Sequence, residues 1–297
     1  MKPPPFDYED PETLAGALEL ASRLDNHKLL AGGQSLMPML NMRFVQPDHV
    51  IDLNRIAELA YIDDVDTVVR IGSMTRQHEL LESDVIARRL PLMREALEQV
   101  GHVQTRNRGT IGGSLCHLDP AAELPCVLMA CDGVVEAQSV RGTRRIAMRD
   151  FPAFYMTPAI EPDEIVTAIE VAPWAAGHGS AFLEFARRHG DFAQASVAVL
   201  IASSPDGAIE RASLAVGGLA TAPQRIAEAE RMLAGSMPTA ALVRAAAQAC
   251  GDIEATDDAH APAAYRRQLA VALTERALKL ALVRSDAANG GLHEPNA

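Results

Sequence analysis

The sequence predicts an α+β protein with two domains. Its length of 297 residues exceeds the roughly 100–200 residues of a typical single domain. Helical and extended patterns are mixed up to about residue 176, whereas strand-like runs come first and helices later in the rest of the chain. Strands followed by helices are typical of α+β domains. We expect a first domain over 1–176, a small α+β domain over 177–285 and a disordered tail over 286–297.

Helices and strands alternate in the first part of the chain. Apolar residues at helical spacing mark the helices, and short apolar runs beside breaking residues mark the strands. Pro91 divides a long helical pattern, and Asp119 can cap the helix that follows it. In chain order the patterns predict a helix over 14–24, strands over 28–30, 49–53 and 65–72, two helices within 76–100, a polar loop over 101–109 and a helix over 120–130.

Beyond Gly133 the pattern changes to short β-type runs, and segment 173–179 is the best candidate for an interdomain linker. The runs on either side of the linker predict a mixed sheet, with strands over 134–137, 145–147, 165–171 and 181–186. The second domain is predicted to hold strands over 182–187, 197–202 and 209–216, followed by helices over 227–233, 239–249 and 263–283.

Composition and charge exclude several classes of function. Acidic residues outnumber basic ones by 39 to 27, and the net charge of −12 argues against a surface that follows nucleic-acid phosphates. No apolar stretch is long enough to span a bilayer, and the N-terminus lacks the apolar region of a signal peptide. The 4 cysteines are too few and too scattered for a disulfide framework. We therefore expect a cytoplasmic protein with reduced thiols.

Two glycine-rich turns carry the strongest chemical signal, Ala31-Gly32-Gly33-Gln34-Ser35-Leu36 and Thr110-Ile111-Gly112-Gly113-Ser114-Leu115. A Gly-Gly pair lets the backbone approach a ligand closely, and consecutive N–H groups form a concave anion site. Either turn alone is explained equally well as an ordinary chain reversal. Neither matches the fingerprint of the Rossmann fold or of the P-loop. Together they predict two sides of one diphosphate site, held by N–H groups.

Polar side chains near these turns are further candidates for the same site. The hydroxyl groups of Ser35, Thr110 and Ser114 can donate hydrogen bonds to phosphate oxygens. Arg106 or Arg108 can add charge-assisted hydrogen bonds, although a solvated loop also explains both arginines. The sequence therefore offers several phosphate donors around the second turn.

Other residues have both a functional and a purely structural explanation. Glu123 can accept hydrogen bonds from ribose or ribityl hydroxyls, or can simply stand at a helix N-terminus. Phe192 follows a Gly-Asp turn and can face a ring system or belong to the core. Cys116, His117 and Asp119 lie close together, but no second ligand pair has zinc or iron–sulfur spacing. We therefore predict no metal site, and the sequence shows no hydrolase motif.

The motifs together resemble the FAD-binding medium subunit of the molybdenum hydroxylases, the family of xanthine dehydrogenase and carbon monoxide dehydrogenase. The resemblance covers nearly the whole chain. Its most specific parts are Leu30–Leu36, Gln104–Leu115 and Asp119-Pro120-Ala121-Ala122-Glu123-Leu124-Pro125, supported by Val50–Leu53, Ile71-Gly72-Ser73, Phe151, Glu164-Ile165 and Arg187–Asp191. It implies a two-part FAD-binding domain of the vanillyl-alcohol-oxidase (PCMH) type, followed by the C-terminal domain of carbon monoxide dehydrogenase flavoproteins.

The resemblance also implies which residues bind a non-covalent FAD. It departs from the family pattern at Ser114, where asparagine is common, at Glu123, where aspartate is common, and at Phe192, where many relatives have tyrosine beside the flavin. The first two departures keep hydrogen-bonding capacity. The implied FAD-binding residues are Leu30, Ala31, Gly32, Gly33, Gln34, Ser35, Leu36, Arg106, Thr110, Ile111, Gly112, Gly113, Ser114, Glu123, Ile165 and Phe192.

A role in electron transfer follows from the resemblance. It implies a small partner with [2Fe-2S] clusters, a large partner with the molybdopterin cofactor, a dimer of such heterotrimers, and an external electron acceptor. No residue of this chain then acts on the substrate as acid, base or nucleophile. Two alternatives stay open: a stand-alone flavin dehydrogenase or oxidase with its own substrate pocket, and a scaffold subunit without flavin. The sequence names neither the substrate nor the acceptor.

Overall fold

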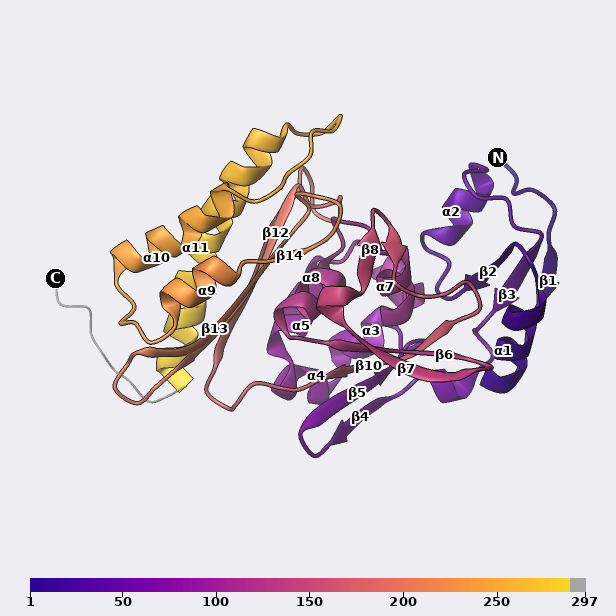
Figure 1. Ribbon diagram of the computed structural model, residues 1–297, viewed down its shortest axis with the longest axis horizontal. Helices are drawn as coiled ribbons and strands as arrows, with labels where there is room; N and C mark the ends of the chain where they lie inside the picture. Colours follow the sequence, from indigo (N-terminus) through magenta and orange to yellow (C-terminus); the bar gives the residue numbers. More distant parts are fainter. Residues whose placement is uncertain (289–297) are drawn as a thin grey trace.

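The N-terminal segment forms a small lobe around a three-stranded parallel sheet with the order β1-β3-β2. Thr13 caps the first helix by accepting a hydrogen bond from the N–H of Gly16, and the helix buries its apolar face against the sheet. The computed structural model describes residues 1–288 of the chain. The lobe contains β1 (Asp7–Glu9), α1 (Leu14–Arg23), β2 (His27–Leu30), α2 (Leu36–Asn41) and β3 (His49–Asp52), and lies at one end of the molecule (Figure 1).

The central part is built on a five-stranded sheet with the order β4-β5-β10-β6-β7. Every neighbouring pair is antiparallel, so the prediction of a mixed sheet was wrong. The predicted strand over 65–72 is a hairpin, because Asp66 turns the chain with φ 50°. The strands are β4 (Ile62–Val65), β5 (Val68–Gly72), β6 (Val134–Ser139), β7 (Gly142–Ala147) and β10 (Ile165–Val171), and a small hairpin holds β8 (Pro152–Phe154) and β9 (Thr157–Pro158).

Six helices lie between β5 and β6 in the sequence. Ser83 ends one helix and caps the next, which gives three helices where two were predicted. The predicted polar loop contains a helix, and the second glycine-rich turn is itself helical from Ile111. Asp119 accepts from the N–H of Ala121, but the helix begins later, at Glu123. The helices are α3 (Gln77–Glu82), α4 (Asp84–Arg89), α5 (Pro91–Gln99), α6 (Val103–Arg108), α7 (Ile111–His117) and α8 (Glu123–Ala130).

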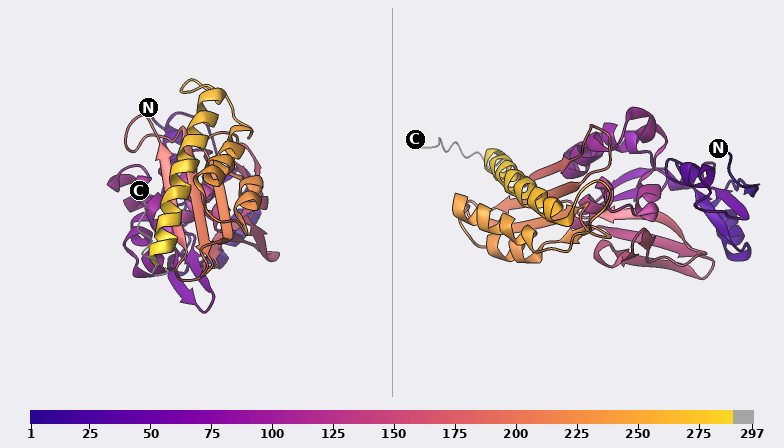
Figure 2. Two further views of the ribbon diagram at one scale, coloured as in Figure 1. Left: turned by 90° about the vertical axis from the view of Figure 1, so that its left-hand side faces the viewer. Right: turned by 90° about the horizontal axis from the view of Figure 1, so that it is seen from above.

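The C-terminal part is a four-stranded antiparallel sheet covered by helices on its outer face (Figure 2). The order of strands before helices is the predicted one. Helix α11 continues through Ala288, so residues 286–288 of the predicted tail are helical, and the rest of that tail lies outside the described residues. The elements are β11 (Gly179–Phe185), β12 (Ala195–Ser203), β13 (Ile209–Gly217), β14 (Gln224–Arg225), α9 (Ala227–Leu233), α10 (Ala240–Gln248) and α11 (Ala263–Ala288).

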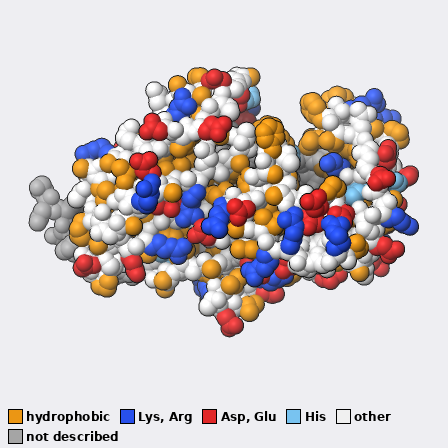
Figure 3. All heavy atoms as spheres, in the orientation of Figure 1, with side chains coloured by type: hydrophobic (Ala, Val, Ile, Leu, Met, Phe, Trp, Pro, Cys, Tyr) orange, Lys and Arg blue, Asp and Glu red, His pale blue; other side chains and the backbone are white. Residues whose placement is uncertain are grey.

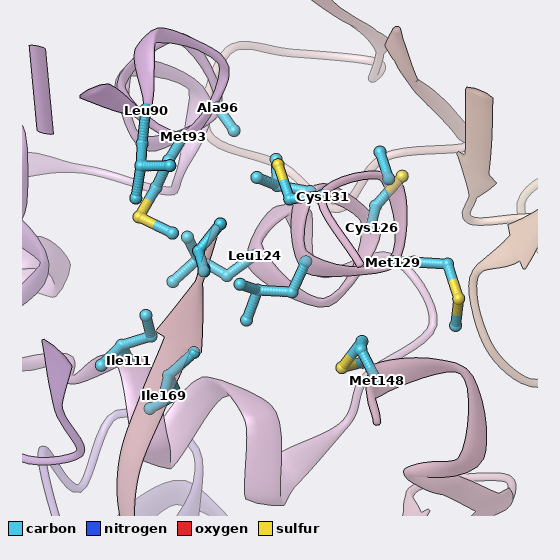
Figure 4. Close-up of a cluster of buried hydrophobic side chains, with 14 of the residues drawn as sticks. Leu90, Met93, Ala96, Ile111, Leu124, Cys126, Met129, Cys131, Met148 and Ile169 are labelled. Carbon is cyan, nitrogen blue, oxygen red and sulfur yellow. The ribbon is translucent and has the colours of Figure 1, made fainter. Parts of the chain in front are cut away.

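This sheet separates two hydrophobic cores. Val197 and Val199 face α9–α11, whereas Ala198 and Leu200 face α5 and α8, so the middle of β12 is buried on both faces. Helix α8 is buried from Leu124 to Ala130, because it lies between the central helices and this sheet (Figure 4). The central and C-terminal parts therefore share one core. No helix among residues 1–288 is long and apolar enough to cross a membrane.

Candidate functional site

The two glycine-rich turns lie against each other, although 78 residues separate Gly32 from Thr110 in the printed sequence. A Cβ atom added to Gly32 would lie 2.2 Å from the carbonyl oxygen of Arg108 and 2.8 Å from the Cα of Gly109. One added to Gly113 would lie 3.4 Å from the Cβ of Ala31. The prediction that both turns contribute to one place in the fold is therefore confirmed by the structure.

The first turn has unused hydrogen-bond donors. Gly33 has φ +72°, a conformation that glycine adopts at little cost. Among the described residues, no acceptor pairs with the backbone N–H groups of Gly32, Gly33, Gln34 or Ser35, and the Ser35 hydroxyl is also free. The Gln34 amide donates to the Gly32 carbonyl, which stabilises the turn. Consecutive free N–H groups of this kind suit an anion.

The second turn is different, because its N–H groups are already bonded within the protein. The N–H of Ile111 donates to the Thr75 carbonyl, and that of Gly112 to the Ser73 carbonyl. Thr110 caps α7 by accepting from the N–H of Gly113. The predicted row of free N–H groups is therefore wrong at this turn. The predicted hydroxyl donors of this turn, Thr110 and Ser114, donate no hydrogen bond in the described part of the chain, so both hydroxyl groups can still donate to a ligand.

Asn54 and Arg76 join the two turns, and the sequence reasoning missed both. The Arg76 guanidinium donates to the Arg108 carbonyl (Nη1 to O, 2.6 Å) and to the Asn54 side chain (Nη2 to Oδ1, 2.6 Å). Asn54 in turn donates to the Ala31 carbonyl (2.9 Å). Burial is the main cause that lowers the pKa of Arg76, and the positive charge of Arg108 adds to it. The only signal in the sequence was that polar residues follow two strand patterns, Asn54 after β3 and Arg76 after β5.

Two of the predicted residues are not aimed at the turns. Arg106 donates to the Val100 carbonyl at the end of α5 (Nη1 to O, 2.7 Å), so its predicted charge on a phosphate has no support in the structure. Ile165 is fully buried and packs in the core beneath the N-terminal lobe. Any contact from Ile165 to a ligand would therefore come from its backbone. Leu30 and Leu36 flank the first turn and are half-buried.

Glu123 stands on the far side of the second turn, at the first residue of α8. Burial raises the pKa of its carboxyl to about 7, and the Asp119 charge adds to the shift. Burial also raises the pKa of Glu184 on β11 to about 8, with the Glu123 charge as the second cause. Neither carboxyl forms an ion pair in the described residues. This flank of the site therefore presents two carboxyl groups that can accept hydrogen bonds and, when protonated, also donate them, whereas the first turn presents donors only.

Phe192 is an exposed aromatic residue in the connection after β11, with 71% of its surface accessible. It follows a turn in which Gly190 has φ +78°. A Cβ atom at Gly190 would lie 2.4 Å from the His102 ring, so the turn packs closely on the start of α6. The alternative that Phe192 is a core residue is wrong.

These features can be tested against FAD, the cofactor that the sequence implies. The glycines leave no side chain between the backbone and a ligand at the first turn, and free N–H groups line it. Acceptors and an exposed ring stand beyond the second turn. The surface is hollowed between the N-terminal lobe and the central part (Figure 3). The residues present fit a ligand with a diphosphate, hydroxyl groups and a flat ring.

Comparison with known families and proteins decides the identity of the chain. Residues 4–174 match the family described as the FAD binding domain in molybdopterin dehydrogenase, and residues 180–281 match the CO dehydrogenase flavoprotein C-terminal domain. The chain belongs to the FAD-binding medium subunits of the molybdenum hydroxylases. The family predicted from the sequence is thus confirmed, as is its fold of an FAD-binding domain followed by a C-terminal flavoprotein domain.

Relatives of this medium subunit match it over nearly their full length. It is 40% identical over 287 residues to the 6-hydroxypseudooxynicotine dehydrogenase complex subunit alpha of Paenarthrobacter nicotinovorans, covering 96% of this chain and 97% of that one. It is 38% identical over 280 residues to the glyceraldehyde dehydrogenase medium chain of Sulfolobus acidocaldarius, covering 94% and 99%. The solved carbon monoxide dehydrogenase of Hydrogenophaga pseudoflava superposes with a TM-score of 0.93 at 36% identity, covering 96% and 99%.

The cysteines and histidines of this medium subunit form no metal site in residues 1–288, where no three metal-ligating side chains gather. Cys126, Cys131 and Cys250 are buried free thiols, and Cys116 is half-buried. Burial raises the pKa of Cys126 and Cys131 to about 12, so both stay protonated at neutral pH.

Proposed function

We propose that this medium subunit binds FAD non-covalently at the junction of the two glycine-rich turns. In this role it takes electrons from [2Fe-2S] clusters of a partner and passes them to an external acceptor. The observation that carries the proposal is the first turn, where four backbone N–H groups in a row, from Gly32 to Ser35, have no partner in the described chain. A diphosphate supplies the acceptor oxygens and the negative charge that such a turn accommodates.

Each part of the site has a distinct task in this proposal. The N–H groups of the first turn and the hydroxyls of Ser35, Thr110 and Ser114 would hold the diphosphate. Glu123 would accept hydrogen bonds from the hydroxyl groups of the cofactor, and Phe192 would lie at the edge of its ring. The bound FAD supplies one- and two-electron chemistry, while the protein supplies binding, orientation and electrostatics. No side chain of this subunit acts on the substrate.

The partners follow from the relatives. Related medium chains belong to dehydrogenases named for 6-hydroxypseudooxynicotine, for glyceraldehyde and for carbon monoxide. Three unlike substrates with one kind of flavin subunit are explained if the substrate binds to another chain. We propose a large molybdopterin subunit and a small [2Fe-2S] subunit as partners, a dimer of heterotrimers as the assembly, and the cytoplasm as its location, where the free thiols stay reduced.

FAD reconstitution of the purified chain tests the binding proposal. The first turn is probed by Gly33→Ala, because a Cβ at φ +72° strains the turn and would meet the side chains of Leu30 and Met37 at 3.2 Å. The matched control is Gly235→Ala, where φ is +75° and nothing lies within 4 Å. Both variants carry the same backbone strain of about 1–2 kcal/mol, but only Gly33 lies at the proposed site.

We expect the wild type and Gly235→Ala to take up FAD, and Gly33→Ala to bind it at least about tenfold more weakly, a loss of about 1.4 kcal/mol. Titration followed by flavin fluorescence measures the affinities. Equal affinities in the two variants contradict the assignment of the turn. Turnover of an organic substrate by the isolated, FAD-loaded chain contradicts the electron-transfer role and favours a stand-alone flavin enzyme.

A further inference from the structure

A buried arginine near the start of α11 holds three loops of the C-terminal part together. Arg266 is 5% exposed, and its Nη1 donates to the carbonyl oxygens of Gln194 (3.0 Å) and Gly218 (2.6 Å). Its Nη2 donates to Oδ2 of Asp258 (2.6 Å), and its Nε is buried without a partner. Burial of a guanidinium group costs free energy, and one donor is left unsatisfied, so stability alone is a poor explanation for this residue.

The first of these loops carries Phe192. Gln194 ends the connection between β11 and β12, and its N–H closes that connection by donating to the Phe185 carbonyl (2.8 Å). The same connection packs on the start of α6 through Gly190 and His102. Helix α6 leads into the second glycine-rich turn, so the Phe192 connection contacts the segment that precedes that turn in the chain.

The second loop contacts the segment that follows the same turn in the chain. Gly218 has φ +79°, and its N–H donates to the Pro120 carbonyl (2.7 Å). Pro120 lies in the segment that joins α7 to α8 and ends at Glu123. Gly218 thus accepts from Arg266 through its carbonyl oxygen and donates to the Pro120 carbonyl through its N–H.

We propose that Arg266 is a positioning residue for the ring-bearing half of FAD. It fixes the Phe192 connection relative to the Pro120–Glu123 segment, which follows the second glycine-rich turn in the chain. The inference rests on the proposed FAD site and extends it. Arg266 lies outside that site but holds in place the Phe192 connection and the Pro120–Glu123 segment, which would contact the flavin half of the cofactor. The diphosphate end, at the first turn, does not depend on Arg266.

The chemistry of arginine suits this task better than that of lysine. The guanidinium presents donors on separate nitrogens in a rigid plane, so one side chain reaches two carbonyl groups and a carboxylate in fixed directions. The Asp258 carboxylate that pairs with it also accepts from the N–H groups of His260 and Ala261, and these bonds with the arginine lower the pKa of Asp258 to about 2. A lysine in the same place can keep the charge but not all three contacts.

The test compares FAD with ADP, which carries the adenine and the diphosphate but no flavin ring. Affinities for both are measured by titration of the full chain as wild type, Arg266→Lys and Arg276→Lys, the last being an exposed arginine on the same helix. We expect Arg266→Lys to bind FAD about tenfold more weakly, to bind ADP as the wild type does, and to change the visible circular dichroism of bound FAD. Arg276→Lys should leave all three unchanged.

The outcomes separate this inference from the proposed function. A wild type that binds neither FAD nor ADP overturns both. A wild type that binds both, with Arg266→Lys weakening the two ligands equally or weakening neither, overturns the inference and leaves the proposed function intact. If Arg266→Lys does not fold, the variant Asp258→Asn replaces it in the test. Asparagine lacks the negative charge that pairs with Arg266, so the contact between the two side chains is weakened. We then expect the same loss of affinity for FAD but not for ADP, and the absence of this loss contradicts the inference.

Discussion

The two glycine-rich turns look alike in sequence but use their backbone groups in different ways. In the first turn, Gly32 to Ser35 keep their N–H groups free. In the second, Ile111 to Gly113 donate theirs to Thr75, Ser73 and the Thr110 side chain. The glycines of the second turn instead allow close packing, since a Cβ at Gly112 would lie 2.6 Å from the Cβ of Ser73. A Gly-Gly motif therefore marks a place where another group comes close to the backbone. Whether that group is a ligand or another part of the protein is shown only by the hydrogen bonds of the turn.

This difference divides the proposed site into two halves. The first turn supplies free donors for a diphosphate, whereas the second turn supports it and leads to the acceptors Glu123 and Glu184. Substitutions in one half, or in the connection between the halves, should therefore have different effects on stability and on FAD binding.

The largest effect is expected from Gly32→Ala, which forces the halves apart. Its Cβ would lie 2.2 Å from the backbone oxygen of Arg108, and backbone cannot move aside as a side chain can. Overpacking of this kind costs about 1–3 kcal/mol, and FAD binding should be lost with the contact between the turns. Thermal denaturation and FAD titration measure both effects. A variant with wild-type Tm and FAD affinity would show that the turns do not meet as described.

Gly112→Ala should separate stability from binding. The added Cβ would lie 2.6 Å from the Cβ and 2.7 Å from the carbonyl oxygen of Ser73, so the packing conflict is with Ser73 and not with the first turn. We expect its Tm to fall further than that of Gly33→Ala, while its affinity for ADP falls less. If the two variants show the reverse order in Tm or in ADP affinity, the assignment of binding to the first turn and of packing to the second is contradicted.

Arg76→Met removes the link between the turns without adding bulk. The Arg108 carbonyl and the Asn54 amide lose their partner, at a cost of about 1–3 kcal/mol. FAD affinity should fall because the first turn is no longer fixed to the second. The exposed Arg88, which bonds within its own helix, provides the control Arg88→Met. Isothermal titration with FAD checks the result, and equal affinities in the two variants contradict the linking role.

The smallest effect is a pH dependence of stability from the acceptor flank. Folding raises the carboxyl pKa values to about 7 for Glu123 and about 8 for Glu184, above the usual value of about 4.3. The folded chain then binds more protons than the unfolded chain between pH ~4.5 and ~8, so these groups make stability fall as the pH rises through that window. Below this pH window both carboxyl groups are protonated in the folded and in the unfolded chain, so they do not change the free energy of unfolding.

Glu184→Gln removes the carboxyl group with the higher pKa, and with it the larger of the two losses of stability at high pH. Its Tm should match that of the wild type near pH 4.5 and exceed it increasingly up to about pH 8, with the exposed Glu210→Gln as the control. Differential scanning calorimetry across this range measures the difference. A Tm difference that does not change with pH means that the Glu184 carboxyl is ionised alike in both states.

Much of the fold could be predicted, because periodicity reports burial on one face. The predicted strand 165–171 and helix 227–233 coincide with β10 and α9. The errors have local causes. The helical second turn contains two glycines, which are poor helix formers, and it is stabilised by hydrogen bonds to the distant residues Ser73 and Thr75. Ser83 ends one helix and starts another within a single periodic pattern.

The candidate site was predicted where local sequence determines it and missed where it depends on the folded chain. The two turns could be found from their glycines, and Phe192 is exposed, although its predicted role at the flavin stays a prediction. Arg76 acts on a carbonyl group 32 residues away, which no spacing rule indicates. Arg106 was assigned to phosphate from its charge, but its guanidinium bonds the Val100 carbonyl six residues earlier.

The most direct test of the unequal turns is amide NMR of the chain labelled with 15N-glycine and titrated with ADP. The free donors of the first turn predict that the N–H signals of Gly32 and Gly33 shift most, and that the signal of Gly112, bonded to Ser73, stays nearly in place. A large shift at Gly112 with no change at Gly32 and Gly33 would contradict the account.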